Sequence, residues 1–209
     1  MGRLGIDRER PLFIVDVDEV LGLFMASFGV FLQGHGLELR LDRYALFQNI
    51  YAPGAAEHLD LAEGRRLFDE FFRRGCADME PAPGAAEALR RISRQATVVV
   101  LSNAPAPARL GRARWLGRHG LDYPLMLSSG PKGPPAAAMA ARTTRRCAFV
   151  DDLVSNLDSV AEADPGVARF QHVADVRLQP LAPAAPDRHR RIDDWTELGE
   201  AVAASLAER

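Results

Sequence analysis

The 209-residue sequence is short of several residue types and patterns. Its 26 basic residues include a single lysine, Lys132, and it has only two cysteines, Cys76 and Cys147. Two cysteines cannot build a disulfide framework, and neither lies in a metal-binding spacing. No apolar run approaches the roughly 20 residues that span a bilayer, and the first residues lack the hydrophobic core of a signal peptide. We therefore expect a soluble, cytoplasmic protein with no membrane partner.

The charge of the chain is also small. It has 26 basic and 28 acidic residues, which give a formal net charge of -2. So weak a charge does not favour a nucleic-acid polymer or an anionic membrane as a partner. The composition is 47% hydrophobic and 26% charged, which excludes a wholly disordered or collagen-like protein. A chain of this length buries about 70% of its unfolded surface, enough for a full hydrophobic core.

Short apolar runs alternate with longer amphipathic segments along most of the chain. Buried strands are predicted at 11–18, 97–103, 123–129 and 146–152, with a weaker fifth at 167–173. Helical patterns cover 85–93, 105–120, 133–144, 155–164 and 193–209. This alternation predicts an α/β fold with a Rossmann-like parallel sheet, and such sheets bind ligands at the carboxyl ends of their strands.

The segment from 22 to 80 interrupts the alternation. Its pattern is helical over 24–33, 41–51 and 63–74, and it contains seven of the ten phenylalanines. We interpret it as a helical cap domain inserted after the first strand, so that residues 1–21 and 81–209 form the α/β core domain. Most of its phenylalanines are expected in the core of the cap. Phe24, which closely follows the first strand, is expected to face the site and contact substrate.

Polar residues lie at the ends of four predicted strands or in the loops that follow them. They are Asp16 and Asp18, Ser102 and Asn103, Lys132, and Asp151 and Asp152. Carboxylates that converge repel each other unless a cation or a shared proton intervenes, and a hard divalent cation prefers such oxygen ligands. A hydroxyl and an ammonium beside that cation complete a site for a doubly charged anion such as phosphate.

These strand ends resemble the four motifs of the haloacid dehalogenase (HAD) superfamily, whose members are mostly phosphatases. The motifs are here FIVDVDEV, VVVLSN, GPKGPP and AFVDDLVSN, in that order between residues 11 and 160. The first departs from the commonest pattern at Glu19, where glycine is frequent, and at Val20, where threonine is frequent. Both positions vary within the family, and the role of Glu19 stays open. The resemblance implies a HAD-like core with a small helical cap of the C1 type.

The resemblance also implies a mechanism. Asp16 would be the nucleophile that forms an aspartyl-phosphate, and Asp18 would be the general acid and then the general base. Asp16, Asp152 and the backbone carbonyl of Asp18 would hold Mg²⁺ as the cofactor.

The remaining strand-end residues would support that reaction. The resemblance assigns Ser102, Asn103 and Lys132 to the phosphoryl oxygens. Asp151 would hold a metal-bound water, and Asn156 would brace the acidic loop or contact Lys132. The arginines between 109 and 118 are expected to form a solvated helix face, and the five histidines share no catalytic spacing.

The function that the resemblance implies is Mg²⁺-dependent hydrolysis of a small phosphate monoester. The pieces DVDEVLGLF, MEPAPGAAEALRRI and ARWLGRHGLDYP resemble the 5′(3′)-deoxyribonucleotidases, so a nucleoside monophosphate is the leading candidate. A phosphotransferase or mutase would keep every motif, whereas a dehalogenase on the same fold would generally lack Asp18. A non-catalytic binding module is the alternative of another class, because strand-end acids can be helix caps alone. The substrate's identity and the oligomeric state stay open.

Overall fold

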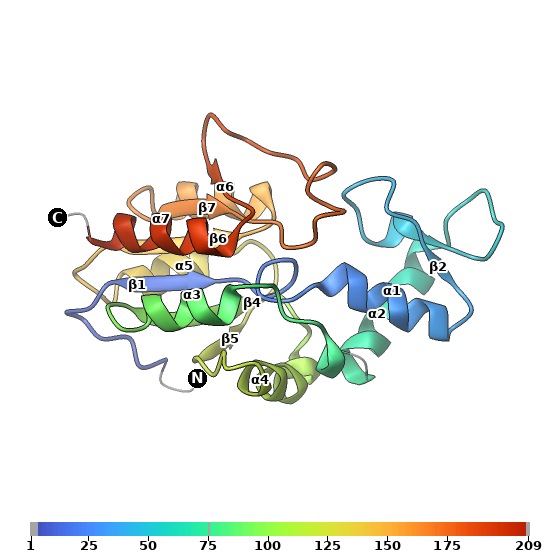
Figure 1. The fold of residues 1–209 in the computed structure, drawn as a ribbon, viewed down its shortest axis with the longest axis horizontal. Coiled ribbons are helices and arrows are strands. Elements are labelled where there is room, and N and C mark those ends of the chain that lie inside the picture. Colours follow the sequence, from blue (N-terminus) through green and yellow to red (C-terminus); the bar gives the residue numbers. More distant parts are fainter. Residues whose placement is uncertain (1–3, 75, 208–209) are drawn as a thin grey trace.

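The computed structural model describes residues 4–74 and 76–207, and its centre is a six-stranded parallel sheet (Figure 1). The strands are β1 (Leu12–Val15), β4 (Thr97–Ser102), β5 (Leu125–Leu127), β6 (Cys147–Asp151), β7 (Ala168–Gln171) and β8 (Arg190–Arg191). Their order is β5-β4-β1-β6-β7-β8, and each pair of neighbours is parallel. The predicted α/β fold is confirmed. The two-residue strand β8 was missed because two arginines carry no apolar pattern.

Helices cover both faces of this sheet. They are α3 (Ala85–Ile92), α4 (Arg109–Arg118), α5 (Gly133–Ala140), α6 (Val154–Ala163) and α7 (Trp195–Ala207), with a short 3₁₀ turn, η3 (Ala106–Ala108). Alternate residues of a strand point to opposite faces. Phe13 and Val15 accordingly pack in the cluster that includes α3 and α7, and Leu12 and Ile14 pack in the one that includes α5 and α6. Residues 208 and 209 of the predicted last helix lie outside the described residues.

Strand β1 occupies the position that decides where a site forms. It lies between β4 and β6, and Val15 is level with Val100 on one side and with Val150 on the other. β4 and β6, which both follow β1 in the sequence, therefore pair with it on opposite sides. The strand order reverses at this position, and open α/β sheets bind ligands at such a switch point. The residues that follow these three strands meet at one edge.

The inserted segment lies beyond this edge of the sheet, at the right of Figure 1. It comprises α1 (Phe24–Gly34), β2 (Glu38–Leu39), η1 (Phe47–Asn49), β3 (Ile50–Tyr51), α2 (Leu61–Arg74) and η2 (Cys76–Asp78). The helix predicted over 41–51 is wrong: this range is a loop with the short 3₁₀ turn η1, and it ends in β3, which pairs antiparallel with β2. Buried Asn49 donates from its amide to the carbonyls of Arg43 and Ala45, and such local bonds compete with a helix.

Phenylalanines from α1 and α2 form the core of the inserted segment. The rings of Phe28 and Phe71 are 5.4 Å apart and the rings of Phe24 and Phe72 are 5.9 Å apart. Such pairs contribute roughly 0.5–1.5 kcal/mol each beyond the area that they bury. The aromatic spacing seen in the sequence therefore holds α1 against α2.

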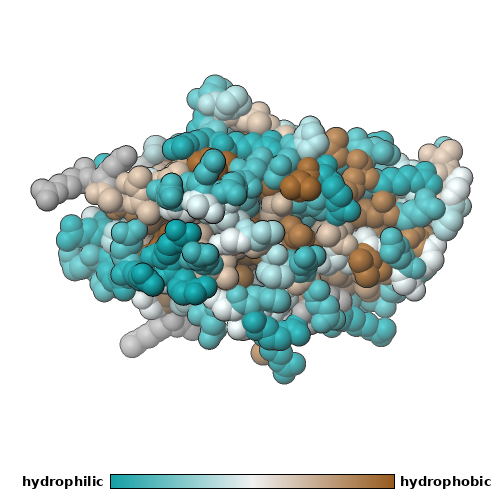
Figure 2. Space-filling model, viewed as in Figure 1, coloured by the Kyte–Doolittle hydropathy of each residue, from teal (hydrophilic) through white to brown (hydrophobic). Residues whose placement is uncertain are grey.

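The face of the molecule that Figure 2 draws is mostly hydrophilic, and hydrophobic side chains lie on it in separate groups. Within residues 4–74 and 76–207, no helix combines the length and the apolar character needed to cross a membrane.

Candidate active site

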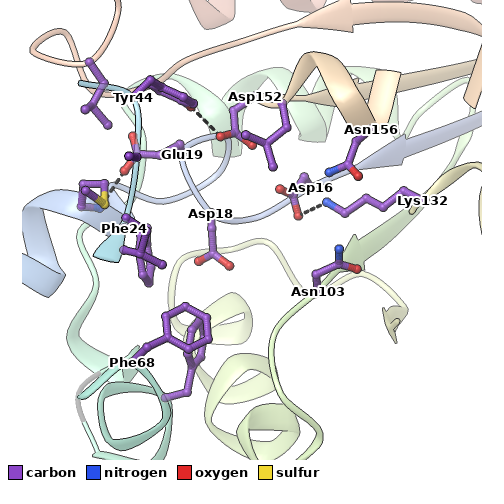
Figure 3. A pocket seen from close by; sticks show the side chains of 16 residues that line it. Asp16, Asp18, Glu19, Phe24, Tyr44, Phe68, Asn103, Lys132, Asp152 and Asn156 are labelled. Carbon is purple, nitrogen blue, oxygen red and sulfur yellow. Dashed lines mark hydrogen bonds and ion pairs between the residues drawn. The ribbon is translucent and has the colours of Figure 1, made fainter. Parts of the chain in front are cut away.

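A cavity of about 240 Å³ lies between the carboxyl edge of the sheet and the inserted segment (Figure 3). The core lines it mainly with polar side chains, and α1, α2 and the loop around residue 45 line it mainly with apolar ones. Of the predicted site residues, Asp16, Asp18, Phe24, Asn103, Lys132, Asp152 and Asn156 line the cavity. Ser102 and Asp151 are fully buried and lie outside its lining.

Lys132 joins two of the predicted acids. Its Nζ is 2.6 Å from Asp16 Oδ1 and 2.7 Å from Asp151 Oδ2, and its side chain is 1% exposed. Gly133 positions this lysine, because a Cβ there would lie 2.1 Å from the carbonyl oxygen of Ser159 on α6. Only glycine permits α5 to begin so close to α6. The single lysine of the chain is therefore a buried residue between two carboxylates.

Asp151 is held from three directions. Its Oδ2 pairs with Lys132, and its Oδ1 accepts hydrogen bonds from the Leu153 backbone N–H at 3.0 Å and from Asn156 Nδ2 at 2.9 Å. The Asn156 side chain therefore contacts the acidic loop through Asp151. Both oxygens of Asp151 therefore have partners, and these bonds fix the carboxylate relative to Lys132 and the start of α6.

Asp152 makes a contact to the inserted segment that the sequence did not reveal. Tyr44 Oη donates a hydrogen bond of 2.5 Å to Asp152 Oδ2. The two residues are 108 positions apart, and no spacing rule connects them. Beside Asp152, burial raises the pKa of Tyr44 far above its ordinary value, so the phenol remains a donor. The inserted segment is thereby bonded to a predicted metal ligand.

Asp18 is bound by an arginine that was expected in solvent. Arg112 on α4 is fully buried, and its Nη2 lies 2.7 Å and 2.8 Å from the two carboxylate oxygens of Asp18. The prediction of a solvated arginine face is wrong at this position. The α4 pattern RLGRARWLGR has charged residues on every side of the helix, so periodicity did not separate Arg112 from its exposed neighbours.

Glu19 occupies the turn between β1 and α1. Its φ of 58° lies in the left-handed region, which explains why glycine suits this position. Its Oε1 accepts a 2.7 Å hydrogen bond from the Met25 backbone N–H at the start of α1. This bond gives a partner to a backbone N–H at the start of the helix that would otherwise lack one. Burial raises the pKa of the Glu19 carboxyl to about 8.

Ser102 and Asn103 differ in access to the cavity. The fully buried Ser102 Oγ accepts a hydrogen bond from the Ala104 backbone N–H. Asn103 lines the cavity, donates from Nδ2 to the Gly130 carbonyl at 2.9 Å and accepts from Ser128 Oγ at 2.8 Å. Asn103 is therefore the residue after β4 that a ligand in the cavity meets first.

The acidic residues fit a divalent cation. One oxygen each of Asp16, Asp151 and Asp152 lies within 4.8 Å of the others, and all three residues are buried. Three carboxylates face one ammonium, so two negative charges are left over when all are ionised. Burial raises the pKa of Asp16 to about 7 against the opposing effect of Lys132, with repulsion from Asp151 and Asp18 adding to the rise. Burial, with repulsion from Asp151 and Asp16, raises the pKa of Asp152 well above its ordinary value. A hard divalent cation with oxygen ligands removes this cost.

Comparison with solved structures identifies the fold. Magnesium-bound YfnB of Bacillus subtilis, described as a HAD-hydrolase, superposes with a TM-score of 0.60 at 14% identity, over 94% of this chain and 99% of that one. The defluorinating L-2-haloacid dehalogenase Rha0230 gives 0.59 at 16% identity, over 93% and 95%. The D,D-heptose 1,7-bisphosphate phosphatase of B. bronchiseptica, with magnesium and phosphate, gives 0.52 at 16% identity, over 93% and 98%.

These likenesses confirm, at the level of the fold, the resemblance that the four motifs carry. No family model matches the chain, and no curated protein matches it. The structures named above include a phosphatase and a dehalogenase, so the fold alone does not choose between these reactions. The choice depends on the residues of the cavity.

The raised pKa values predict how stability changes with pH. Between about pH 4 and pH 7 the folded protein holds a proton on Asp16 that the unfolded chain has lost, so stability falls as pH rises through this range. We expect the melting temperature in EDTA to drop by about 5 °C from pH 5.5 to pH 8.5. Millimolar Mg²⁺ should remove most of this drop. The test is to measure the melting temperatures of wild type and of Asp16→Asn, in which the drop should be smaller. Equal melting temperatures of the wild type in EDTA and in Mg²⁺ at pH 8.5 would contradict the prediction.

The Arg112–Asp18 pair predicts an asymmetric effect on stability. Asp18→Ala leaves a fully buried guanidinium without its carboxylate and should cost about 3–5 kcal/mol of unfolding free energy. Arg112→Met leaves only Asp18, whose side chain is 25% exposed, and should cost about 1–3 kcal/mol. The double variant should lose less than the sum, by about 1–3 kcal/mol. Urea unfolding of the four proteins measures this coupling, and strictly additive losses would show that the pair contributes nothing.

Proposed function

We propose that this chain, which has the fold of the HAD hydrolases, hydrolyses small phosphate monoesters in the cavity with the help of Mg²⁺. The arrangement around Lys132 carries the proposal. A buried ammonium holds one oxygen of Asp16 at 2.6 Å, and Asp152 lines the same cavity. A carboxylate nucleophile, a point charge for phosphoryl oxygens and an acidic metal site are thereby combined in one cavity.

Asp16 is the residue to which we assign nucleophilic attack. Lys132 holds its Oδ1, which leaves Oδ2 to attack phosphorus and form the aspartyl-phosphate. Lys132 then offsets the charge that develops on the phosphoryl oxygens, and the Asn103 amide lies in the same lining to bind one of them. Asp16, Asp152 and the Asp18 backbone carbonyl would hold Mg²⁺, which when bound neutralises further negative charge on these oxygens.

Asp18 is the residue to which we assign proton transfer. It lines the cavity on the side of Phe68, where Figure 3 shows its carboxylate. Arg112 binds both oxygens of Asp18, so one of these bonds must open before Asp18 can carry a proton. A leaving oxygen on that side would then take the proton from Asp18, and the water that hydrolyses the intermediate would return one. The presence of this second acid favours a phosphatase over a dehalogenase. The proposed partner is a small phosphorylated metabolite, with a nucleoside monophosphate as one candidate, and the proposed compartment is the cytoplasm.

The direct test is a panel of phosphate monoesters assayed with and without Mg²⁺. Asp16→Asn should abolish turnover, at least about 10⁴-fold, because asparagine cannot form the covalent intermediate. The fold should survive, since the two side chains are nearly isosteric. Asp122→Asn, at an exposed position, is the matched control and should keep full activity.

EDTA should silence the wild-type enzyme, and added Mg²⁺ should restore it. Activity of Asp16→Asn within tenfold of wild type would remove Asp16 from the nucleophile role. Full activity in EDTA on a 2-haloacid, with none on phosphate esters, would support the dehalogenase alternative. Binding of esters without turnover would support the non-catalytic module, and release of phosphate only to an added acceptor would support a phosphotransferase.

Lys132→Arg is the sharpest test of the phosphoryl-binding charge. Nζ lies between two carboxylates in a space that leaves the side chain 1% exposed, and a guanidinium is larger and planar. We expect kcat/KM to fall by about 2–4 kcal/mol of transition-state stabilisation. The control is Arg142→Lys, the reverse exchange at an exposed position. Thermal melting checks that the variant folds, and a wild-type rate would place Lys132 outside the reaction.

A further inference from the structure

The polar and apolar walls of the cavity differ enough to specify the substrate more closely. We infer that the leaving group is a compact, uncharged and apolar alcohol or phenol. The inference narrows the proposed substrate class: it excludes sugars, groups with a second anionic charge and nucleosides, and so it removes the nucleoside monophosphate from the candidates. It rests on the proposed phosphatase function and names the substrate class of the same site.

The wall that the inserted segment forms is almost entirely hydrocarbon. The inserted segment supplies Phe24, Leu46, Phe68 and Phe72, and Leu153 adds to it from the core. The rings of Phe68 and Phe72 are 4.7 Å apart, and those of Phe24 and Phe72 are stacked at 5.9 Å. Packed aromatic rings form a preformed apolar surface. An apolar group that binds against it is stabilised by the hydrophobic effect.

The inserted segment offers little polarity to a ligand. Tyr44 is its one polar side chain in the described lining, and its hydroxyl already donates to Asp152. The hydroxyl groups of a sugar, or the polar edge of a nucleobase, would lose their bonds to water against this wall. Discrimination of roughly 10²-fold is typical when a hydrophobic pocket meets an added hydroxyl.

The charges of the cavity oppose a second anionic group. Lys132 is the one cation in the described lining, and Asp16 and Asp151 already hold it. The guanidinium carbon of Arg112 lies over the Phe72 ring, 5.1 Å from its centroid, but this side chain is fully buried and bound to Asp18. A second phosphate or a carboxylate on the leaving group would therefore meet acids and phenylalanine, with no cation to pair with, and this mismatch selects against it.

The size of the cavity favours a compact ester. Its volume of about 240 Å³ lies below the roughly 300–1,000 Å³ of sites for drug-sized ligands. The phosphoryl group occupies the end near Asp16 and Lys132. The rest accepts about one ring or a short alkyl chain.

Two matched pairs of substrates test this inference on the wild-type enzyme with Mg²⁺. n-Butyl phosphate and glycerol 1-phosphate are both alkyl esters, and the butyl ester should have a kcat/KM at least about 10-fold higher. The phosphates of methyl 4-hydroxybenzoate and of 4-hydroxybenzoate differ by one charge. The neutral ester should be preferred by at least about 100-fold.

A change in the wall should move this charge preference. Leu46→Arg places a cation in the cavity and should raise kcat/KM for the 4-hydroxybenzoate phosphate at least about 10-fold relative to its methyl ester. The matched control is Leu41→Arg, in a separate groove lined by Leu23, Val30 and Arg177, where the ratio should not change. The wild-type substrate pairs decide the matter even if Leu46→Arg does not fold.

The outcomes separate the inference from the function on which it rests. Equal rates within each pair, a preference for the charged or hydroxylated member, or a nucleoside 5′-monophosphate that surpasses butyl phosphate would overturn the substrate class alone. Failure to hydrolyse any of the esters with Mg²⁺ would overturn the phosphatase function, and the inference with it.

Discussion

The buried contact of Lys132 with Asp16 and Asp151 is the interaction on which the site depends. The parallel strands of the sheet end at this edge, and two of them, β1 and β6, bring carboxylates that would repel each other without a cation. One ammonium between Asp16 and Asp151 offsets part of that repulsion, and the excess of negative charge beside Asp152 suits a divalent cation. The same charges that should make the fold less stable at high pH are those to which we assign the proposed metal and phosphoryl group.

Two contacts connect this acidic edge to the rest of the cavity wall. Tyr44 reaches from the inserted segment to Asp152, and Arg112 holds Asp18 while its guanidinium lies over the ring of Phe72. Both contacts use long polar side chains whose tips alone touch the acids. The inserted segment is therefore tied to the residues of the proposed chemistry, and a substitution in it can change both the site and the substrate preference.

The cavity has a polar edge and an apolar wall because the sheet supplies one and the inserted segment supplies the other. The core supplies the charged side chains because parallel strands end together. The insertion supplies phenylalanines because α1 and α2 pack against each other through aromatic rings, which continue the hydrophobic cluster of the sheet. Phe24 and Phe72 serve both surfaces, since each is in the aromatic cluster and lines the cavity. A wall that stabilises the insertion is thus also the proposed surface for the leaving group.

The sequence by itself determined the parallel sheet, the strand ends where polar residues gather and the unusual status of Lys132, because strand periodicity and a lone lysine among arginines are local signals. Only the tertiary structure decided which distant side chains meet. Tyr44 pairs with Asp152 across 108 positions and Arg112 with Asp18 across 94, and no periodicity encodes such contacts. The loop over 41–51, with its 3₁₀ turn and β3, was misread as a helix because a buried asparagine bonding to nearby carbonyls outweighed the local pattern. Local sequence signals determine the helices and strands, whereas tertiary packing determines which of their side chains line the same cavity.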